Sequence, residues 1–152
     1  MTLMMSLILS CSVFVGFADN VPEVVKKALT EQYAGAELEE VLWSTEQDAY
    51  VASFNGDRDQ LHKVYFSAEG KWLQTQLRLY PSQLPNRLYD YYEMNYFERD
   101  VTFLCKVLLP EQSVEYRIEW ETLEAVHIER LNEYGQVLEN KQIPFTEGFE
   151  LW

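Results

Sequence analysis

The chain has 152 residues, of which 47% are apolar and 14% aromatic, a composition that excludes an intrinsically disordered protein. This length fits one domain of ordinary size, or two very small ones that share a core. The net charge of −13 argues against nucleic acid or an anionic membrane surface as a partner, because both require clustered Lys and Arg side chains.

The first 18 residues carry no charged side chain, and we predict that residues 1–18 form a signal peptide. The apolar run from Leu3 to Phe17 is too short for a typical membrane span but fits the hydrophobic region of a secretory signal. Small residues at Gly16 and Ala18 suit a cleavage site, so we expect cleavage after Ala18 and a periplasmic or secreted mature domain, 19–152. The pattern departs from a standard signal in having no Lys or Arg before Lys26.

Two alternatives to this leader remain open. The apolar run could be a buried strand, or Ile8-Leu9-Ser10-Cys11 could be a lipobox that attaches a lipid anchor at Cys11. Removal of the leader would leave Cys105 as the only cysteine, so no internal disulfide could form. Cys105 lies in a strand-like run and is interpreted as a small buried hydrophobic residue, because a nucleophile would also need a neighbouring His.

The first half of the mature chain predicts one helix followed by four strands. The helix is expected over about 21–34, where Val21, Val25 and Leu29 share one stripe. A β-hairpin at 64–73, with Gly70 in its turn, is the clearest strand signal. The four expected strands cover about 38–43, 50–54, 61–66 and 72–79.

The second half predicts the same order of elements. A helix is expected over about 84–97, and its Tyr89, Tyr92 and Tyr96 form a stripe that we assign to the core, with an exposed aromatic ridge as the alternative. Strands are expected at about 101–109, 113–121, 124–131 and 136–143. The tail from Pro144 to Trp152 is apolar enough to pack back on the domain.

The two halves recur at a nearly constant spacing. Gly70 and Gly135 are 65 residues apart, and Phe54 and Trp120, both assigned to the buried face, are 66 apart. We therefore predict two tandem repeats, about 21–80 and 84–143, in an α+β fold with one curved antiparallel sheet and the helices on one face. Aligning the glycines sets Val64 against Glu129, which breaks the inward apolar pattern unless a bulge near Ile128 corrects it.

Several short motifs in this order resemble one family. They are Val21-Pro22-x-x-Val25, Val41-x-Trp43, Tyr50-x-Ala52-x-Phe54, Val64-x-Phe66-x-x-x-Gly70 and a second start at Leu84-Pro85. Together they resemble the β-lactamase-inhibitor-like, PepSY-like proteins, which are small exported bacterial proteins. The resemblance implies a fold like the β-lactamase inhibitor protein, with a concave sheet face, and an association with binding or inhibiting secreted enzymes, chiefly peptidases. It supplies no catalytic residues. Lys106, where the first unit has Trp43, departs from the pattern.

Two groups of polar residues are candidate metal ligands, one in each half. The first is Asp57, Asp59 and His62, and the second is Glu124, His127 and Glu129. Charged residues are common at such turns and strand starts, so we predict no metal site and no cofactor. Neither a serine nucleophile motif nor a glycine-rich phosphate loop is present, and we predict a protein that is not an enzyme.

The favoured function is therefore an exported module that binds another protein or a peptide of the cell envelope, with inhibition or regulation of a secreted or periplasmic enzyme as one expected role. A small-ligand carrier or an enzyme that uses the concave face is the alternative. Strand alternation places Val64, Phe66, Leu73, Leu77 and Leu79 toward the helices. The partner-binding residues predicted on the opposite face are Tyr65, Trp72, Gln74, Gln76, Arg78, Arg117 and Glu119.

Overall fold

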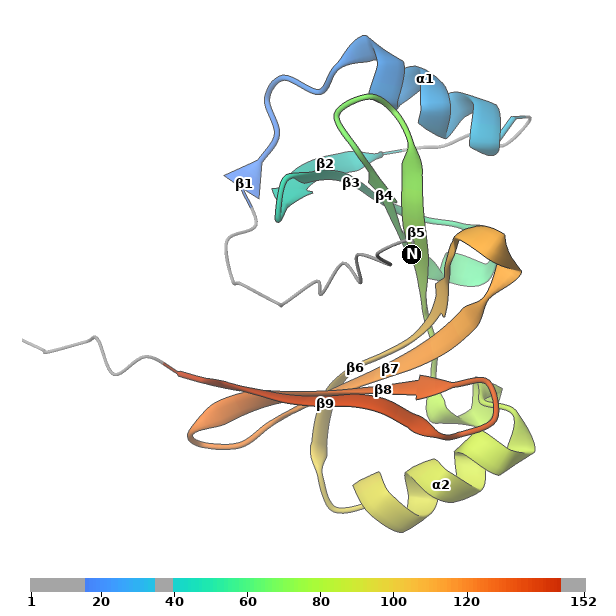
Figure 1. Ribbon diagram of the computed structural model, residues 1–152, viewed down its shortest axis with the longest axis vertical. Coiled ribbons are helices and arrows are strands. Elements are labelled where there is room, and N and C mark those ends of the chain that lie inside the picture. The colour runs from blue at the N-terminus through green and yellow to red at the C-terminus, as the bar shows by residue number, and fades with distance from the viewer. Residues whose placement is uncertain (1–15, 35–39, 146–152) are drawn as a thin grey trace, which may run out of the picture.

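In the computed structural model, which describes residues 16–34 and 40–145, two helices cover the convex side of one curved antiparallel sheet (Figure 1). The helices are α1, Glu23–Gln32, and α2, Asn86–Tyr96. The strands are β1 Gly16–Phe17, β2 Leu42–Glu46, β3 Ala49–Asn55, β4 Leu61–Phe66, β5 Trp72–Arg78, β6 Asp100–Leu108, β7 Val114–Glu121, β8 Ala125–Asn132 and β9 Val137–Pro144. Short 3-10 turns lie at Asp57–Asp59, Pro81–Gln83 and Pro110–Gln112.

All nine strands pair in sequence order, each antiparallel to the next. The α+β class, the curved sheet and the common face of the helices agree with the sequence prediction (Figure 1). The first long strand differs, because β2 begins at Leu42 and its hairpin turns through Gln47 and Asp48, both with positive φ. Two residues with positive φ make the tight turn that suits a twisted hairpin. The predicted strand start at Leu38 lies outside the described residues.

Each helix packs over its own apolar cluster on the convex face. Under α1 the cluster includes Val25, Leu29 and Phe66, all 4% exposed or less. Under α2 it is formed by Leu84, Leu88, Tyr96, Leu104, Tyr116, Ile118, Trp120 and Leu131. Among the described residues, neither helix is long and apolar enough to cross a membrane.

Similar aromatic groups anchor the end of each helix to the sheet. Near α1, Tyr33 meets Phe54 edge-on at 5.1 Å between ring centroids, and Phe54 stacks on His62 at 5.2 Å. Near α2, three further rings repeat this arrangement: Tyr96 meets Trp120 edge-on at 5.1 Å, and Trp120 stacks on His127 at 5.0 Å. Edge-to-face and stacked pairs of this kind add to the stability that burial alone provides.

Gly70 and Gly135 occupy the hairpin turns that face the two helices, with φ of +80° and +81°. A side chain is strained at such a φ, so both positions favour glycine. The surroundings differ, because a Cβ at Gly70 would lie 2.9 Å from the backbone oxygen of Val24 in α1, whereas one at Gly135 would meet only Leu88 Cδ2 at 3.5 Å.

This difference predicts unequal effects of the same substitution. Gly135→Ala should lower the free energy of unfolding by about 1–2 kcal/mol, the usual cost of a left-handed backbone for a residue with a Cβ. Gly70→Ala should cost about 1–3 kcal/mol more, because α1 must also move away from the new methyl group. Urea denaturation of both variants measures the difference, and equal losses would contradict the close approach of α1 to this turn.

Candidate protein-binding surface

The concave face of the sheet, opposite the helices, carries a row of paired positions across five strands, and four of the five side chains are charged. Directly paired positions place Arg78, Cys105, Arg117, Arg130 and Glu139 side by side from β5 to β9. Cross-strand partners project to the same face, so three arginines line up on one surface of a protein whose net charge is −13. Nearby carboxylates must compensate for the repulsion between these arginines.

Six of the seven predicted binding residues lie on this concave face by register: Tyr65, Gln74, Gln76, Arg78, Arg117 and Glu119. They are far less accessible than the sequence suggested. Tyr65, Gln76 and Arg117 are 2%, 4% and 8% exposed, whereas Arg78 is exposed. The curvature of the sheet brings these side chains together, so this face is a packed polar layer with a few accessible groups.

Trp72 was predicted on the concave face and Leu73 toward the helices, and the structure reverses both positions. The β4–β5 register shifts between Tyr65, which pairs with Gln74, and Phe66, which pairs with Trp72. The extra residue is Leu73, and such a bulge exchanges the two faces for the residues beyond it. Trp72 therefore packs against the core under α1 and donates a hydrogen bond from Nε1 to Thr75 Oγ1 at 2.9 Å.

Leu73 instead completes a small apolar patch on the concave side with Ala49, Val51 and Tyr65. The Tyr65 hydroxyl donates to Glu46 Oε2 at 3.0 Å, and Lys63 Nζ lies 3.2 Å from Glu46 Oε1. Burial and the Glu46 carboxylate strongly raise the pKa of Tyr65, so its hydroxyl remains a donor at neutral pH. This contact fixes the first half of the concave face.

In the second half, Arg117 is the most buried cation. Its Nη2 lies 2.7 Å from Glu119 Oε1, but its buried Nε has no hydrogen-bond partner among the described residues. A buried donor without a partner loses its hydration without compensation. Sequence alternation placed Arg117 and Glu119 on this face, but it could not indicate the incomplete pairing.

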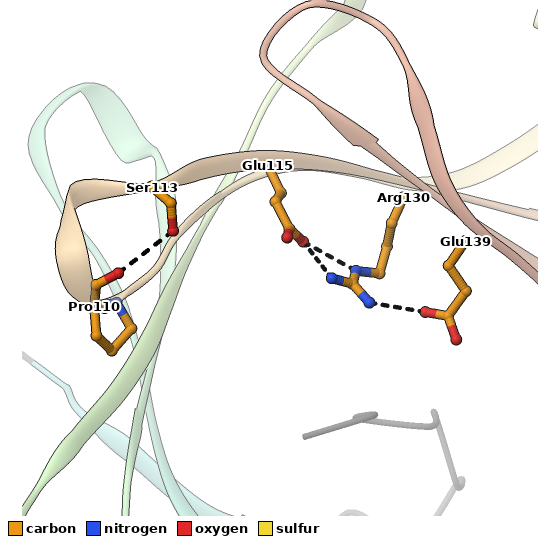
Figure 2. Close-up of polar contacts among 5 residues, drawn as sticks. All are labelled: Pro110, Ser113, Glu115, Arg130 and Glu139. Atoms are coloured by element: carbon orange, nitrogen blue, oxygen red, sulfur yellow. Dashed lines mark hydrogen bonds and ion pairs between the residues drawn. The ribbon is translucent and has the colours of Figure 1, made fainter. Parts of the chain in front are cut away.

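Arg130 was not predicted as part of the site, and it holds two carboxylates (Figure 2). Its Nε and Nη2 donate to Glu115 Oε2 at 3.0 and 2.7 Å, while Nη1 donates to Glu139 Oε2 at 2.9 Å. Burial opposes the charge of Arg130, but the two hydrogen-bonded carboxylates more than offset it and raise the pKa of the guanidinium. At the nearby end of the β6–β7 connection, Ser113 Oγ donates to the Pro110 carbonyl at 3.4 Å. The alternation of polar and apolar residues in β7 indicates that Glu115 lies on this face. Arg130 is recognised as its partner only from the pairing of β7 with β8.

The candidate metal ligands of the two halves do not converge. Among the described residues, no group of three His, Cys, Asp or Glu side chains could hold a metal ion. His62 and His127 stack on aromatic rings, as described above, and burial lowers the pKa of His62 against the opposing effect of Asp57. Both histidines therefore have a packing role in the described structure.

Glu129 lies on the helix-facing side, 5% exposed, and accepts hydrogen bonds from Tyr91 and Tyr96 at 2.7 and 2.6 Å. The position is inward, as Val64 is in the first half, and the predicted bulge near Ile128 does not turn it outward. The register shift of the β8–β9 pair lies at Arg130 and Leu131 instead, and its extra residue is Leu138 of β9. Burial and the Glu129 carboxylate raise the pKa of Tyr91 to about 12. The helix α2 stripe thus combines packing with a polar anchor.

Cys105 and the remaining tyrosines of α2 offer no reactive centre. Cys105 is fully buried, and burial raises the pKa of its thiol to about 12, so it stays protonated and weakly nucleophilic at neutral pH. Tyr92 is partly buried and stacks on Tyr96 at 5.6 Å, whereas Tyr89 is 38% exposed. Of the expected tail contacts, Phe145 is 48% exposed, and residues 146–152 lie outside the described part of the chain.

Comparison with solved structures defines the class of fold as that of the β-lactamase-inhibitor-protein-like (BLIP-like) proteins. A BLIP-like protein from Bacteroides fragilis superposes with a TM-score of 0.68 and 21% identity, covering 86% of this chain and 92% of that one. A DUF2874 family protein from Bacteroides ovatus gives a TM-score of 0.71 and 19% identity, covering 82% of this chain and 89% of that one. A protein from Bacteroides eggerthii that is named as periplasmic gives a TM-score of 0.70 and 20% identity, covering 82% of this chain and 90% of that one. No protein-family model and no curated protein matches the sequence.

Proposed function

We propose that the protein is an exported, non-catalytic module that binds another protein through the concave face of its sheet and so inhibits or regulates a secreted or periplasmic enzyme. The observation that carries this proposal is the row of Arg78, Arg117 and Arg130 across that face. Arg117 and Arg130 are held by carboxylates, and Arg78 is exposed. Arginines are typical anchors of protein interfaces. The BLIP-like fold and the periplasmic name of one structural neighbour support export and binding.

The alternative of a small-ligand carrier has less support. The pocket that Gln76, Arg117 and Arg130 line on the concave face has a volume of about 60 Å³. Sites that enclose a drug-sized ligand usually measure about 300–1,000 Å³. A protein partner needs no such enclosure, because it can cover the face from outside.

The proposal includes a tandem origin for the two halves and a family relationship to the PepSY-like proteins. Its support is the matching order of α1 with β2–β5 and α2 with β6–β9. The rings of Tyr33, Phe54 and His62 also match those of Tyr96, Trp120 and His127 in both order and geometry. In such an arrangement, the concave face is the surface that both units build jointly.

Export should produce a mature N-terminus at Asp19, because Gly16 and Ala18 provide the small residues of a cleavage site. Cleavage would remove the two residues of β1, which pair with Ser44 and Thr45 at the edge of β2. Intact-mass measurement of the exported protein tests this expectation. A lipid adduct on Cys11, or an uncleaved chain in the envelope fraction, would contradict it.

Substitution of Arg78 should weaken partner binding more than it affects folding. Arg78 is exposed at the centre of the sheet, where β5 pairs with β6, and Arg78→Ala removes a charge that a partner can reach. The protein is first used to capture partners from the envelope and medium of the exporting cell, and the affinity of the purified pair is then measured by calorimetry. We expect a loss of at least about tenfold, the usual scale for an interface anchor.

The matched control is Arg87→Ala, which removes an exposed arginine from α2 on the convex side. It should leave the affinity unchanged. If Arg78→Ala folds normally and binds as tightly as the unaltered protein, the concave face is not the contact surface. Tyr89 on α2 would then become the next residue to test.

A further inference from the structure

The pocket on the concave face lies where β5 to β9 come together around the buried Arg117. Its lining residues are Gln74, Gln76, Val107, Leu109, Glu115, Arg117, Ile128, Arg130, Glu139 and Lys141. The wall is therefore charged and polar on one part and aliphatic on another. A single water molecule needs about 10–15 Å³ of cavity volume, so the pocket's 60 Å³ accommodates a small polar group of a few atoms.

Ion pairing around the pocket leaves donors, and not carboxylates, without partners. Glu115 and Glu139 are both bound by Arg130, and Glu119 is bound by Nη2 of Arg117. The buried Nε of Arg117 and the ammonium of Lys141 form no hydrogen bond or ion pair within residues 16–34 and 40–145. The charged donors still available at this pocket call for an acceptor with negative charge.

Arg130 already pairs with two carboxylates, which compensate its charge. All three of its guanidinium nitrogens already donate to Glu115 or Glu139, and Figure 2 shows the two carboxylates on either side of it. Arg130 therefore lines the pocket in a fixed position, where it forms ion pairs with both Glu115 and Glu139. An incoming anion is directed toward Arg117 and Lys141.

From these contacts we propose that the pocket is an acceptor site for one carboxylate group of a binding partner. The carboxylate bonds the Arg117 guanidinium and the Lys141 ammonium, and its short aliphatic stem lies against Val107, Leu109 and Ile128. The inference deepens the proposed function, on which it rests, by naming the chemistry that the concave face selects. The volume of the pocket suits a small group, so an acidic side chain or a chain-terminal carboxylate fits best.

The site is built to select by geometry. The net charge of −13 repels anions at long range, so an acidic group gains only from the contacts it makes inside the pocket. Arg117 is already held in place by Glu119, and a preorganised guanidinium loses little freedom when a second carboxylate binds. Affinity for an isolated carboxylate should be weak and should fall as salt increases.

The test follows the arginine Nε–H signals of the full chain by NMR during titration with sodium acetate, against sodium chloride at equal ionic strength. We expect acetate, but not chloride, to shift the Arg117 signal in a saturable way and to leave the Arg87 signal unchanged. Two short peptides then separate the sources of the carboxylate: one has a capped C-terminus and a single internal Asp, and the other has no acidic side chain and a free C-terminus. A shift with either peptide supports the site and identifies its ligand class.

Two variants make the result specific. Lys141→Gln, on the half-exposed edge strand β9, should fold normally and weaken acetate binding by about tenfold. Arg117→Lys keeps the ion pair with Glu119 but removes Nε–H, and it should abolish the remaining response, which is then read from the backbone signals of β7. Arg87→Gln is the matched control and should bind acetate as the unaltered protein does.

The proposal fails if no carboxylate probe shifts the Arg117 signal in the folded protein, or if chloride produces the same shift as acetate. It also fails if Lys141→Gln leaves the response unchanged. These outcomes concern the purified chain alone, so they are distinguishable from failure of the proposed function. If acetate binds but Arg78→Ala does not weaken binding of any captured partner, the two proposals separate. The acceptor site is then retained, and the concave face is rejected as a protein-binding surface.

Discussion

Replacing Trp120 with Ala should lower the free energy of unfolding by about 3–5 kcal/mol, the range seen for large buried aromatic side chains. Trp120 is 5% exposed, and its ring holds three neighbours at the end of α2. Tyr96 meets it edge-on, His127 stacks on it, and the Arg99 guanidinium lies 4.7 Å from its ring centroid. The alanine variant loses the burial and leaves these three groups without their common contact. Chemical denaturation followed by circular dichroism measures the change.

Phe54→Ala is the parallel experiment in the first half and should have an effect of similar size. Phe54 is 4% exposed and sits between Tyr33 and His62. Leu123→Ala is the control, because Leu123 is fully exposed in the β7–β8 turn and should change stability by less than about 0.5 kcal/mol. A loss below about 1 kcal/mol for either aromatic variant would show that its face is assigned wrongly.

Glu129→Ala should also cost about 3–5 kcal/mol, for a different reason. The substitution leaves the hydroxyls of Tyr91 and Tyr96 without their acceptor beneath α2. It also removes the acceptor for Asn140 Nδ2, at 3.3 Å. Buried donors that lose an acceptor retain the full cost of desolvation, and urea denaturation of the variant measures that cost.

A triple variant distinguishes lost hydrogen bonds from lost packing. Glu129→Val combined with Tyr91→Phe and Tyr96→Phe removes the acceptor and both tyrosine donors, and leaves only Asn140 without its acceptor. Val is the residue at the aligned position 64. Its stability should recover to within about 2 kcal/mol of the unaltered protein, because replacing a whole buried polar group by apolar residues is often nearly neutral. If the triple variant is as unstable as Glu129→Ala, the loss of stability in Glu129→Ala comes from the lost side-chain volume and not from the unpaired tyrosine hydroxyls.

The local turn and periodicity signals carried most of the fold prediction. Gly70 and Gly135 marked two hairpins, and the stripes of α1 and α2 gave both helices to within two residues at each end. Spacing between the halves also brought Glu129 into alignment with Val64, and the structure keeps both positions inward. Glu129, which breaks the apolar pattern of the alignment, is a buried carboxylate that accepts hydrogen bonds from two tyrosines. A pattern of apolar residues cannot indicate such a contact.

Two parts of the site could not be read from periodicity. The bulge at Leu73 has no distinctive residue, so alternation continued through it and put Trp72 on the wrong face. Burial on the concave face depends on the curvature of the whole sheet, so Arg117 looked like an exposed anchor and the role of Arg130 remained hidden. These features arise from pairing between strands, and a single sequence encodes that pairing only indirectly.

The order of the strands has a further consequence for how quickly the chain reaches its native state. Each strand from β1 to β9 pairs with its neighbours in sequence, so no pairing requires contact with a distant segment of the chain. The longest connections between paired strands are those that contain the helices. Short loops close at little entropic cost and hairpins form in microseconds. The sheet can therefore grow hairpin by hairpin along the chain, which predicts fast folding for an all-antiparallel topology with this many strands.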